Sequence, residues 1–252
     1  MKLKHLVEKY INHRQMMGEK FRTNATALRA FCHYLGENSL SHKLSAKKVL
    51  KFLYSKDQIT TGWFIKRTNL QGFYDYAMCR GYIKGCPLPK DLPKRPPGLI
   101  PYIYSKHELR LLFDTALTYK SKSIVEPYAV KVLLQLLYAT GLRLSEALSL
   151  TMEDVDISSM VIVIRETKFY KKRLVPFNQQ VSQIFADYLV WRNKTASLSA
   201  AMFISKRGLG LNINTMRNAF QRIRKKAGIK RLDKANCQPR LHDYGIPLQF
   251  ID

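Results

Sequence analysis

The chain has 252 residues, enough for one large domain or two modest ones that each bury a core. Hydrophobic residues make up 46% and aromatic residues 11%, which excludes an intrinsically disordered chain. The 43 Lys and Arg outnumber the 18 Asp and Glu, for a formal net charge of +25. Such a surplus repels itself in a compact state unless a polyanion neutralises it, so nucleic acid is the expected partner. A merely soluble basic surface is the alternative.

The distribution of charge and the spacing of the cysteines also limit the possible partners and the cellular compartment. Residues 1–104 carry 19 basic and 6 acidic residues, and residues 105–252 carry 24 and 12, so both halves are expected to face the same polyanion. No apolar run approaches a membrane span, and the first residues lack the apolar core of a signal peptide. A long basic amphipathic helix of the kind that lies on an anionic membrane is not evident either. We therefore expect no membrane partner and a cytoplasmic, nucleoid-associated protein. The cysteines lack metal-site or disulfide spacing and are expected to be reduced thiols: Cys32, Cys79, Cys86 and Cys237.

Apolar residues at helical spacing predict four helices in residues 1–84. Asn24 is the expected cap of the second helix, which Gly36 ends, and Ser45 opens the third. This is the pattern of a small helical domain with Lys and Arg on its surface.

Residues 85–103 are rich in proline and basic, which predicts an extended, semi-rigid linker between two domains. Its Lys94 and Arg95 are candidate DNA contacts. An ordinary long surface loop inside one domain is the alternative.

After the linker the pattern is again mainly helical, with one β-rich stretch. Ser105 and Glu108 form a capping-box pattern, and residues 126–138 are almost wholly apolar, which predicts a central helix. Residues 160–166 and 172–177 predict a β-hairpin, and two amphipathic helices follow it. The fold class expected is mainly α with a small β-hairpin or sheet, that is, α+β.

The second of these amphipathic helices, over residues 213–227, carries a basic face. It lies in the stretch 206–240, which holds 11 basic residues and Asp233 as its only acid. Charge of one sign is unusual on a merely solvated face, so we expect this stretch to contact phosphates. The residues nominated on the helix are Arg217, Arg222, Arg224, Lys225 and Lys226.

The most specific segment is Ala139-Thr-Gly-Leu-Arg143-Leu-Ser-Glu146-Ala-Leu. A glycine ends the apolar helix, and Arg143 begins the next one. An arginine fixed at this place makes a phosphate clamp, because its planar guanidinium matches two phosphate oxygens. The alternative is a plain salt bridge between Arg143 and Glu146 on one helix face.

This segment and its surroundings resemble the tyrosine recombinases of the phage integrase type. Thr-Gly-Leu-Arg143-Leu-Ser-Glu-Ala-Leu is similar to their first arginine motif, and Thr-Lys168-x-x-Lys-x-Arg-Leu-Val-Pro-Phe to their hairpin with a catalytic lysine. Pro-Arg-Leu-His242-Asp looks like the start of their H-x-x-R box. The resemblance covers nearly the whole chain in the right order.

The resemblance implies a core-binding, SAM-like domain in residues 1–84, joined by the linker to a partial catalytic domain in residues 104–252. It implies type IB strand transfer, in which a tyrosine attacks a phosphodiester and forms a 3′-phosphotyrosine. Arg143 would clamp the phosphate, Glu146 would support it, Lys168 would be the general acid and His242 the box histidine.

Several further points follow from the resemblance. Arginines neutralise the charge, so neither a metal nor a cofactor is expected. The neighbouring basic residues of the hairpin leave the choice of general acid open and are candidate DNA contacts: Lys171, Lys172 and Arg173. Double-stranded DNA is the implied partner, together with other recombinase protomers on that DNA.

The sequence departs from the family pattern after Asp243. Gly245 stands where the box needs its second arginine, and Pro247 would break the helix that follows. No residue matches the nucleophilic tyrosine, for which Tyr244 is too early; a frame-shifted or truncated reading frame is the simplest explanation. We therefore expect DNA binding without strand cleavage by this chain alone. The alternative is a non-catalytic DNA-binding protein that occupies recombination sites or acts as a regulator; RNA binding is disfavoured because no aromatic stacking platform is evident.

Overall fold

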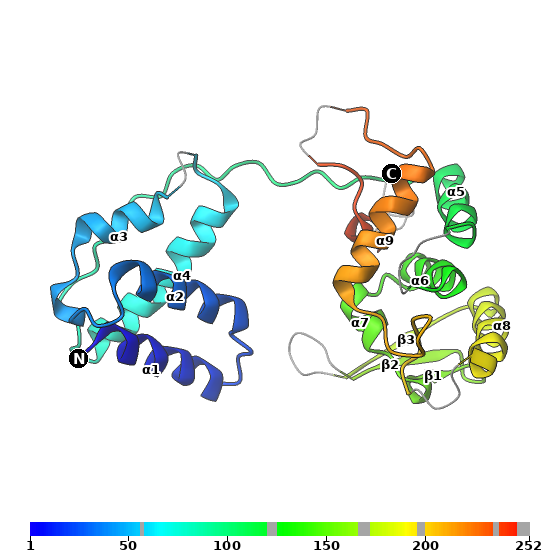
Figure 1. Cartoon of the computed structure of the whole chain (residues 1–252), viewed down its shortest axis with the longest axis horizontal. Helices are drawn as coiled ribbons and strands as arrows, with labels where there is room; N and C mark the ends of the chain where they lie inside the picture. Colours follow the sequence, from blue (N-terminus) through cyan, green and yellow to red (C-terminus); the bar gives the residue numbers. More distant parts are fainter. Residues whose placement is uncertain (56–57, 120–124, 166–171, 196–199, 234–236, 246–252) are drawn as a thin grey trace. The chain divides into compact units, whose positions relative to one another are not determined.

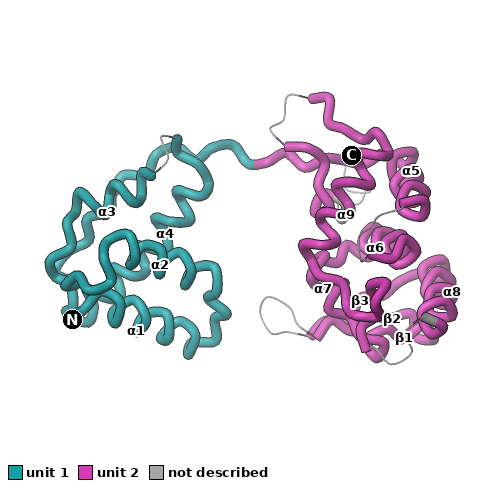
Figure 2. Tube along the Cα trace, in the orientation of Figure 1, with its two compact units in different colours: residues 1–98 teal, residues 99–252 magenta. Residues whose placement is uncertain are grey.

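The computed structural model describes residues 1–55, 58–119, 125–165, 172–195, 200–233 and 237–245. They form two compact units, residues 1–98 and residues 99–252 (Figures 1 and 2). Within the described parts, no helix has the length and apolar character needed to cross a bilayer.

The first unit is a helical bundle around an apolar core. The apolar positions of its first helix from Leu3 to Ile11 recur every three or four residues and are buried, which is why this stretch is helical. Phe31 and Phe73 lie edge to face in the middle of the unit. The α-helices are α1 (Leu3–Met16), α2 (Arg22–Leu35), α3 (Ala46–Leu53) and α4 (Thr61–Cys79), with a short 3₁₀ turn η1 at Ser41–Lys43.

The start of α2 differs from the expectation. Asn24 lies inside the first turn, and the N-cap is Phe21 in the left-handed conformation, at φ 40°. The Phe21 ring is buried and packs edge to face on Tyr10, so core packing fixes where this helix begins. Asn24 accepts a hydrogen bond from Asn69 through its backbone carbonyl. The predicted end at Gly36 and start after Ser45 are confirmed.

Residues 85–103 contain no helix or strand, as expected from their prolines. Their first part packs on the first unit: Leu88 is buried in its core, and the carbonyl of Pro89 accepts a hydrogen bond from Arg67. The guanidinium of Arg95 lies 5.2 Å from the ring centroid of Phe64. This part of the segment therefore follows the surface of one unit.

The second unit is built around α6, whose buried residues pack against α5, α8 and the 3₁₀ turn η3. Ser105 and Glu108 make the predicted capping box at the start of α5. The helices are α5 (Lys106–Leu117), α6 (Pro127–Thr140), α7 (Leu144–Ser149), α8 (Gln179–Thr195) and α9 (Ile213–Lys226), with η2 at Met152–Asp154 and η3 at Leu241–Gly245.

A three-stranded antiparallel sheet completes the second unit, in the order β1 (Val155–Asp156), β2 (Val161–Ile164) and β3 (Arg173–Pro176). Its register pairs Ile164 with Arg173 at the end of the β2–β3 hairpin. The predicted hairpin is thus present, and β1 is an addition too short to show a periodicity. Mainly helical with a small sheet, the fold is of the class expected.

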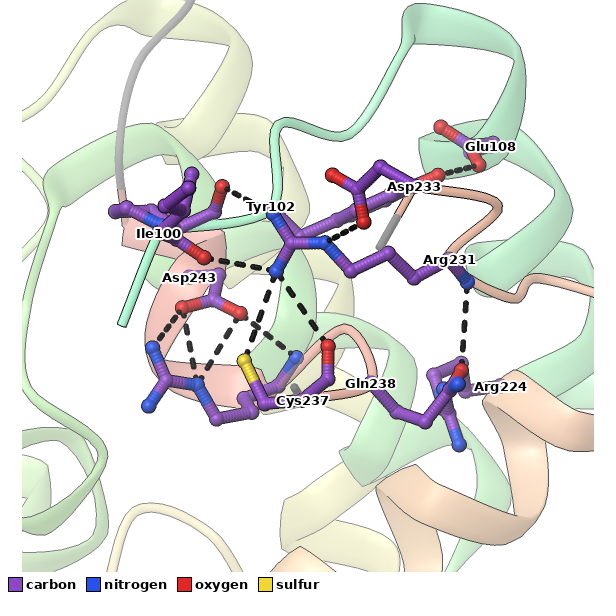
Figure 3. A network of polar contacts seen from close by, with 11 residues as sticks. Ile100, Tyr102, Glu108, Arg224, Arg231, Asp233, Cys237, Gln238 and Asp243 are labelled. Atoms are coloured by element: carbon purple, nitrogen blue, oxygen red, sulfur yellow. Dashed lines mark hydrogen bonds and ion pairs between the residues drawn. The ribbon is translucent and has the colours of Figure 1, made fainter. Parts of the chain in front are cut away.

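Arg231 is buried rather than exposed, with only 3% of its side chain accessible. Its guanidinium donates to the carbonyls of Ile100 (2.7 Å) and Pro101 (3.1 Å) and to the carboxylate of Asp233 (2.6 Å) (Figure 3). Gln238 accepts hydrogen bonds from the backbone of Arg231 and from Arg224. One member of the basic stretch therefore fixes the start of this unit to the segment that precedes η3.

We predict that Leu133→Ala, in the fully buried centre of α6, lowers the free energy of unfolding of the second unit by about 2–5 kcal/mol. The removed methyl groups leave a cavity that close-packed neighbours fill only in part. Urea denaturation followed by circular dichroism measures the change. The same substitution at the 87% exposed Leu232 is the control, with an expected effect within about 0.5 kcal/mol. Equal effects at both positions would contradict the described core.

Candidate functional site

The turn between α6 and α7 positions Arg143. Gly141 ends α6 in the left-handed conformation at φ 63°, which a glycine adopts without a steric cost. Leu142 is then buried, and Arg143 is the N-cap of α7. Because α6 is buried and α7 packs on α9, the backbone of Arg143 is held by the core of the unit.

Glu146 binds two arginines. Its carboxylate accepts hydrogen bonds from the backbone N–H of Arg143 (3.0 Å), from Nη1 of Arg143 (2.8 Å) and from Nη2 of Arg173 (2.8 Å). Only 4% of the Glu146 side chain is exposed, against 59% of Arg143 and 44% of Arg173. The predicted salt bridge is present, and most of the Arg143 guanidinium remains open to solvent. The ion pair and a phosphate clamp are therefore compatible.

The surroundings of Glu146 keep it charged. Burial by itself would raise the pKa of its carboxyl. The hydrogen bonds from the backbone and guanidinium of Arg143, with the positive charges of Arg173 and Arg143, outweigh this effect, so the pKa lies below its usual value. A charged, buried carboxylate with three donors fixes the orientation of both guanidiniums.

Arg143 faces a cleft of about 620 Å³ in the second unit. The cleft is lined by the end of α6, the α6–α7 turn, the first part of α9 and residues 240–243. Three of the nominated residues, Arg143, Arg217 and His242, line it together. All three are exposed. Arg143 and Arg217 are 74 residues apart in the sequence, and Arg217 and His242 are 25 residues apart.

Sequence reasoning missed a second arginine–carboxylate pair in the same cleft. Arg240 and Asp243 both line it, and the Asp243 carboxylate accepts from the backbone N–H of Arg240 (2.9 Å) and from its Nη2 (2.7 Å). The spacing of three residues repeats that of Arg143 and Glu146. This repetition was the signal in the sequence that could have revealed the pair.

The remaining nominated residues lie elsewhere or outside the described residues. Lys168 and Lys171 belong to residues 166–171, which are outside them, and Lys172 is exposed. Arg224 is half-buried and donates to Gln238. The others are exposed but do not line the cleft: Arg222, Lys225 and Lys226 on α9, and Lys94 and Arg95 in the first unit. Their assignment as DNA contacts remains a prediction.

The described residues include no cluster of three or more His, Cys, Asp or Glu side chains that could hold a metal ion. The polar groups of the cleft are mainly cationic, and its two carboxylates, Glu146 close beside it and Asp243 in its lining, are each paired with arginine. Such an arrangement suits an oxyanion.

The sequence of residues 104–243, more than half of the chain, matches the phage integrase family. The chain belongs to this family. It is 29% identical to the "Putative integrase/recombinase y4rB" of Sinorhizobium fredii over 244 residues, which cover 94% of this chain and 77% of that protein. The tyrosine recombinase XerC of Staphylococcus saprophyticus is 29% identical over 156 residues, 62% of this chain and 51% of XerC.

The fold is also that of a solved integrase. The crystal structure of lambda integrase (residues 75–356) bound to DNA is 15% identical in sequence and superposes with a TM-score of 0.69, covering 97% of this chain and 84% of that one. At this identity the likeness concerns the fold alone. The tyrosine recombinase resemblance and the fold class deduced from the sequence are thus confirmed.

We predict that Glu146→Gln lowers the free energy of unfolding by about 2 kcal/mol at neutral pH, because two guanidiniums lose their charged acceptor. The folded pKa of Glu146 is depressed, so its contribution is present above the unfolded value of about 4.3 and is lost as the pH falls through the folded pKa. Urea midpoints measured from pH 7 down to pH 3 should therefore fall less in the variant than in the parent protein.

Glu153→Gln is the control, since that side chain is 85% exposed and its ion pair with Arg165 is long, at 3.7 Å. Little change is expected there at any pH. If the urea midpoints of the two variants fell equally between pH 7 and pH 3, the role of Glu146 as acceptor for two arginines would be wrong.

Proposed function

We propose that this chain binds double-stranded DNA as a site-specific recombinase of the integrase family, with a backbone phosphate seated in the cleft against Arg143. The observation that carries the proposal is the half-open Arg143 guanidinium, which the buried Glu146 holds at one nitrogen. Its Nε and Nη2 have no acceptor among the described residues and are free to donate to phosphate oxygens.

The charge of the chain supports DNA as the polyanion. A net charge of +25 spread over both units attracts a phosphate backbone over a long distance and releases its counterions on binding. The lambda integrase of similar fold was crystallised bound to DNA, which agrees with this choice. Other protomers of the same chain on one DNA are part of the proposal.

In this proposal the 252 residues bind DNA without cutting it. The family resemblance calls for two arginines on the phosphate, and Gly245 occupies the place of the second one, three residues after His242. Loss of one donor to the charge that develops in the transition state lowers rates by about 10²- to 10³-fold. Arg143, His242 and Lys168 would then serve the binding and orientation of the phosphate.

We predict that Arg143→Ala weakens binding to a duplex about tenfold, as expected for a charged hydrogen bond to phosphate. The slope of log affinity against log salt concentration should become shallower by about 1, because one phosphate contact is lost. Fluorescence anisotropy at several salt concentrations measures both quantities.

Arg110→Ala is the matched control, since it removes the same charge from an exposed position of α5 outside the cleft. Unchanged affinity in Arg143→Ala, or stronger binding to an RNA of the same sequence, would contradict the proposal. Equal losses of duplex affinity in both variants would mean that Arg143 acts only through general electrostatic attraction.

A suicide substrate, which traps the covalent intermediate because the cut strand diffuses away, tests cleavage separately. Incubation of the 252-residue chain with such a duplex should give no covalent protein–DNA adduct on a denaturing gel. An adduct would overturn the non-cleaving part of the proposal while leaving DNA binding intact.

A further inference from the structure

We propose that Arg240 is a second phosphate-binding arginine of the cleft, held in place by Asp243 as Arg143 is held by Glu146. This inference rests on the proposed function, because the phosphate it binds is that of the duplex. Arg240 is the last residue of the basic stretch 206–240, but the sequence did not single it out.

The two arginines have the same local construction. In each, a carboxylate three residues later accepts from the arginine's own backbone N–H, at 3.0 Å for Arg143 and 2.9 Å for Arg240. The same carboxylate accepts from the guanidinium, at 2.8 Å and 2.7 Å. Both carboxylates are buried, with 4% and 1% of the side chain exposed. In each pair, the carboxylate therefore holds one edge of the guanidinium close to the arginine's own backbone N–H, and the other edge is left open.

The free edge of Arg240 has donors to offer. Asp243 takes hydrogen bonds from Nε and Nη2, while Nη1 has no acceptor among the described residues. The Arg240 side chain is 36% exposed, and it lines the cleft together with Arg143 and Arg217. Two nitrogens of Arg143 are free in the same way. Donors from two fixed guanidiniums in one cleft suit a tetrahedral oxyanion with several acceptor oxygens.

The charge of the cleft points to an anion as well. Arg143, Arg217 and Arg240 bring three positive charges, and the two carboxylates Glu146 and Asp243 offset two of them. Arg173 also contacts Glu146 and adds a further positive charge beside the cleft. The surplus is therefore positive before His242 is counted, and a phosphodiester would neutralise it.

The backbone of Arg240 is fixed from a second direction. The hydroxyl of Tyr104, itself buried, donates to the Arg240 carbonyl at 3.2 Å. A guanidinium with a fixed backbone and a fixed edge loses little conformational entropy when it binds a phosphate.

The test uses a double substitution that keeps the net charge of the chain. Arg240→Met with Asp243→Asn removes one positive and one negative charge, so general attraction to DNA is unchanged and no buried carboxylate is left unpaired. We expect duplex affinity to fall roughly tenfold and the salt slope to become shallower by about 1, with the thermal midpoint nearly unchanged.

The matched control is Arg165→Met with Asp154→Asn. This pair has the same architecture, a half-exposed arginine on a carboxylate that is 5% exposed, but it does not line the cleft. It should leave affinity and salt slope close to those of the parent protein. Equal losses in the two double variants would overturn the proposal.

Arg240→Lys covers the case in which the double variant unfolds. Lysine keeps the charge and an ion pair with Asp243 but cannot present a second nitrogen to phosphate. A folded Arg240→Lys protein with several-fold weaker duplex binding supports the proposal, and unchanged binding means that the Arg240–Asp243 pair only holds η3 in place. If Arg143→Ala has no effect in the same assay, it is the proposed function that fails.

Discussion

The cleft depends on one buried carboxylate. Taking the charge of Glu146 out of water is costly, and only close cationic donors offset that cost. The chain supplies them from two distant places, the N-cap of α7 and the first residue of β3. Arg143 and the β2–β3 hairpin are therefore fixed relative to each other by the same group. The open guanidinium of Arg143, and with it any phosphate contact in the cleft, follows from this arrangement.

Most of the fold could be predicted from local signals in the sequence. The apolar periodicity of α1 and α6, the capping box at Ser105 and the glycines that end α2 and α6 each act within a few residues, so they could be recognised without the tertiary structure. The start of α2 could not, because it is decided by where the Phe21 ring packs. The strand β1 has only two residues, too few to show an alternation of apolar and polar residues in the sequence.

The site was predictable in its local part only. The Arg143–Glu146 pair lies within one turn of chain, whereas Arg173 reaches Glu146 across 27 residues of sequence. The basic stretch 206–240 also combines roles that composition cannot separate. Arg217 lines the cleft, but Arg231 is buried on backbone carbonyls, and Arg224 is half-buried against Gln238. An excess of positive charge indicates a polyanionic partner, but only the burial and the hydrogen-bond partners of each side chain show which cations are available to bind it.

Binding a phosphodiester and cleaving it make different demands on such a cleft. Binding in the ground state requires fixed donors and a positive potential, which Arg143, Arg217 and Arg240 supply while Glu146 and Asp243 hold two of them in orientation. Cleavage further requires donors placed where charge develops in the transition state, and a nucleophile. Glycine at position 245 offers no side-chain donor for the first of these. Under the proposed function, the arginines bind the phosphate while position 245 lacks the donor that would accelerate its cleavage, so affinity and rate are separable properties of one cleft.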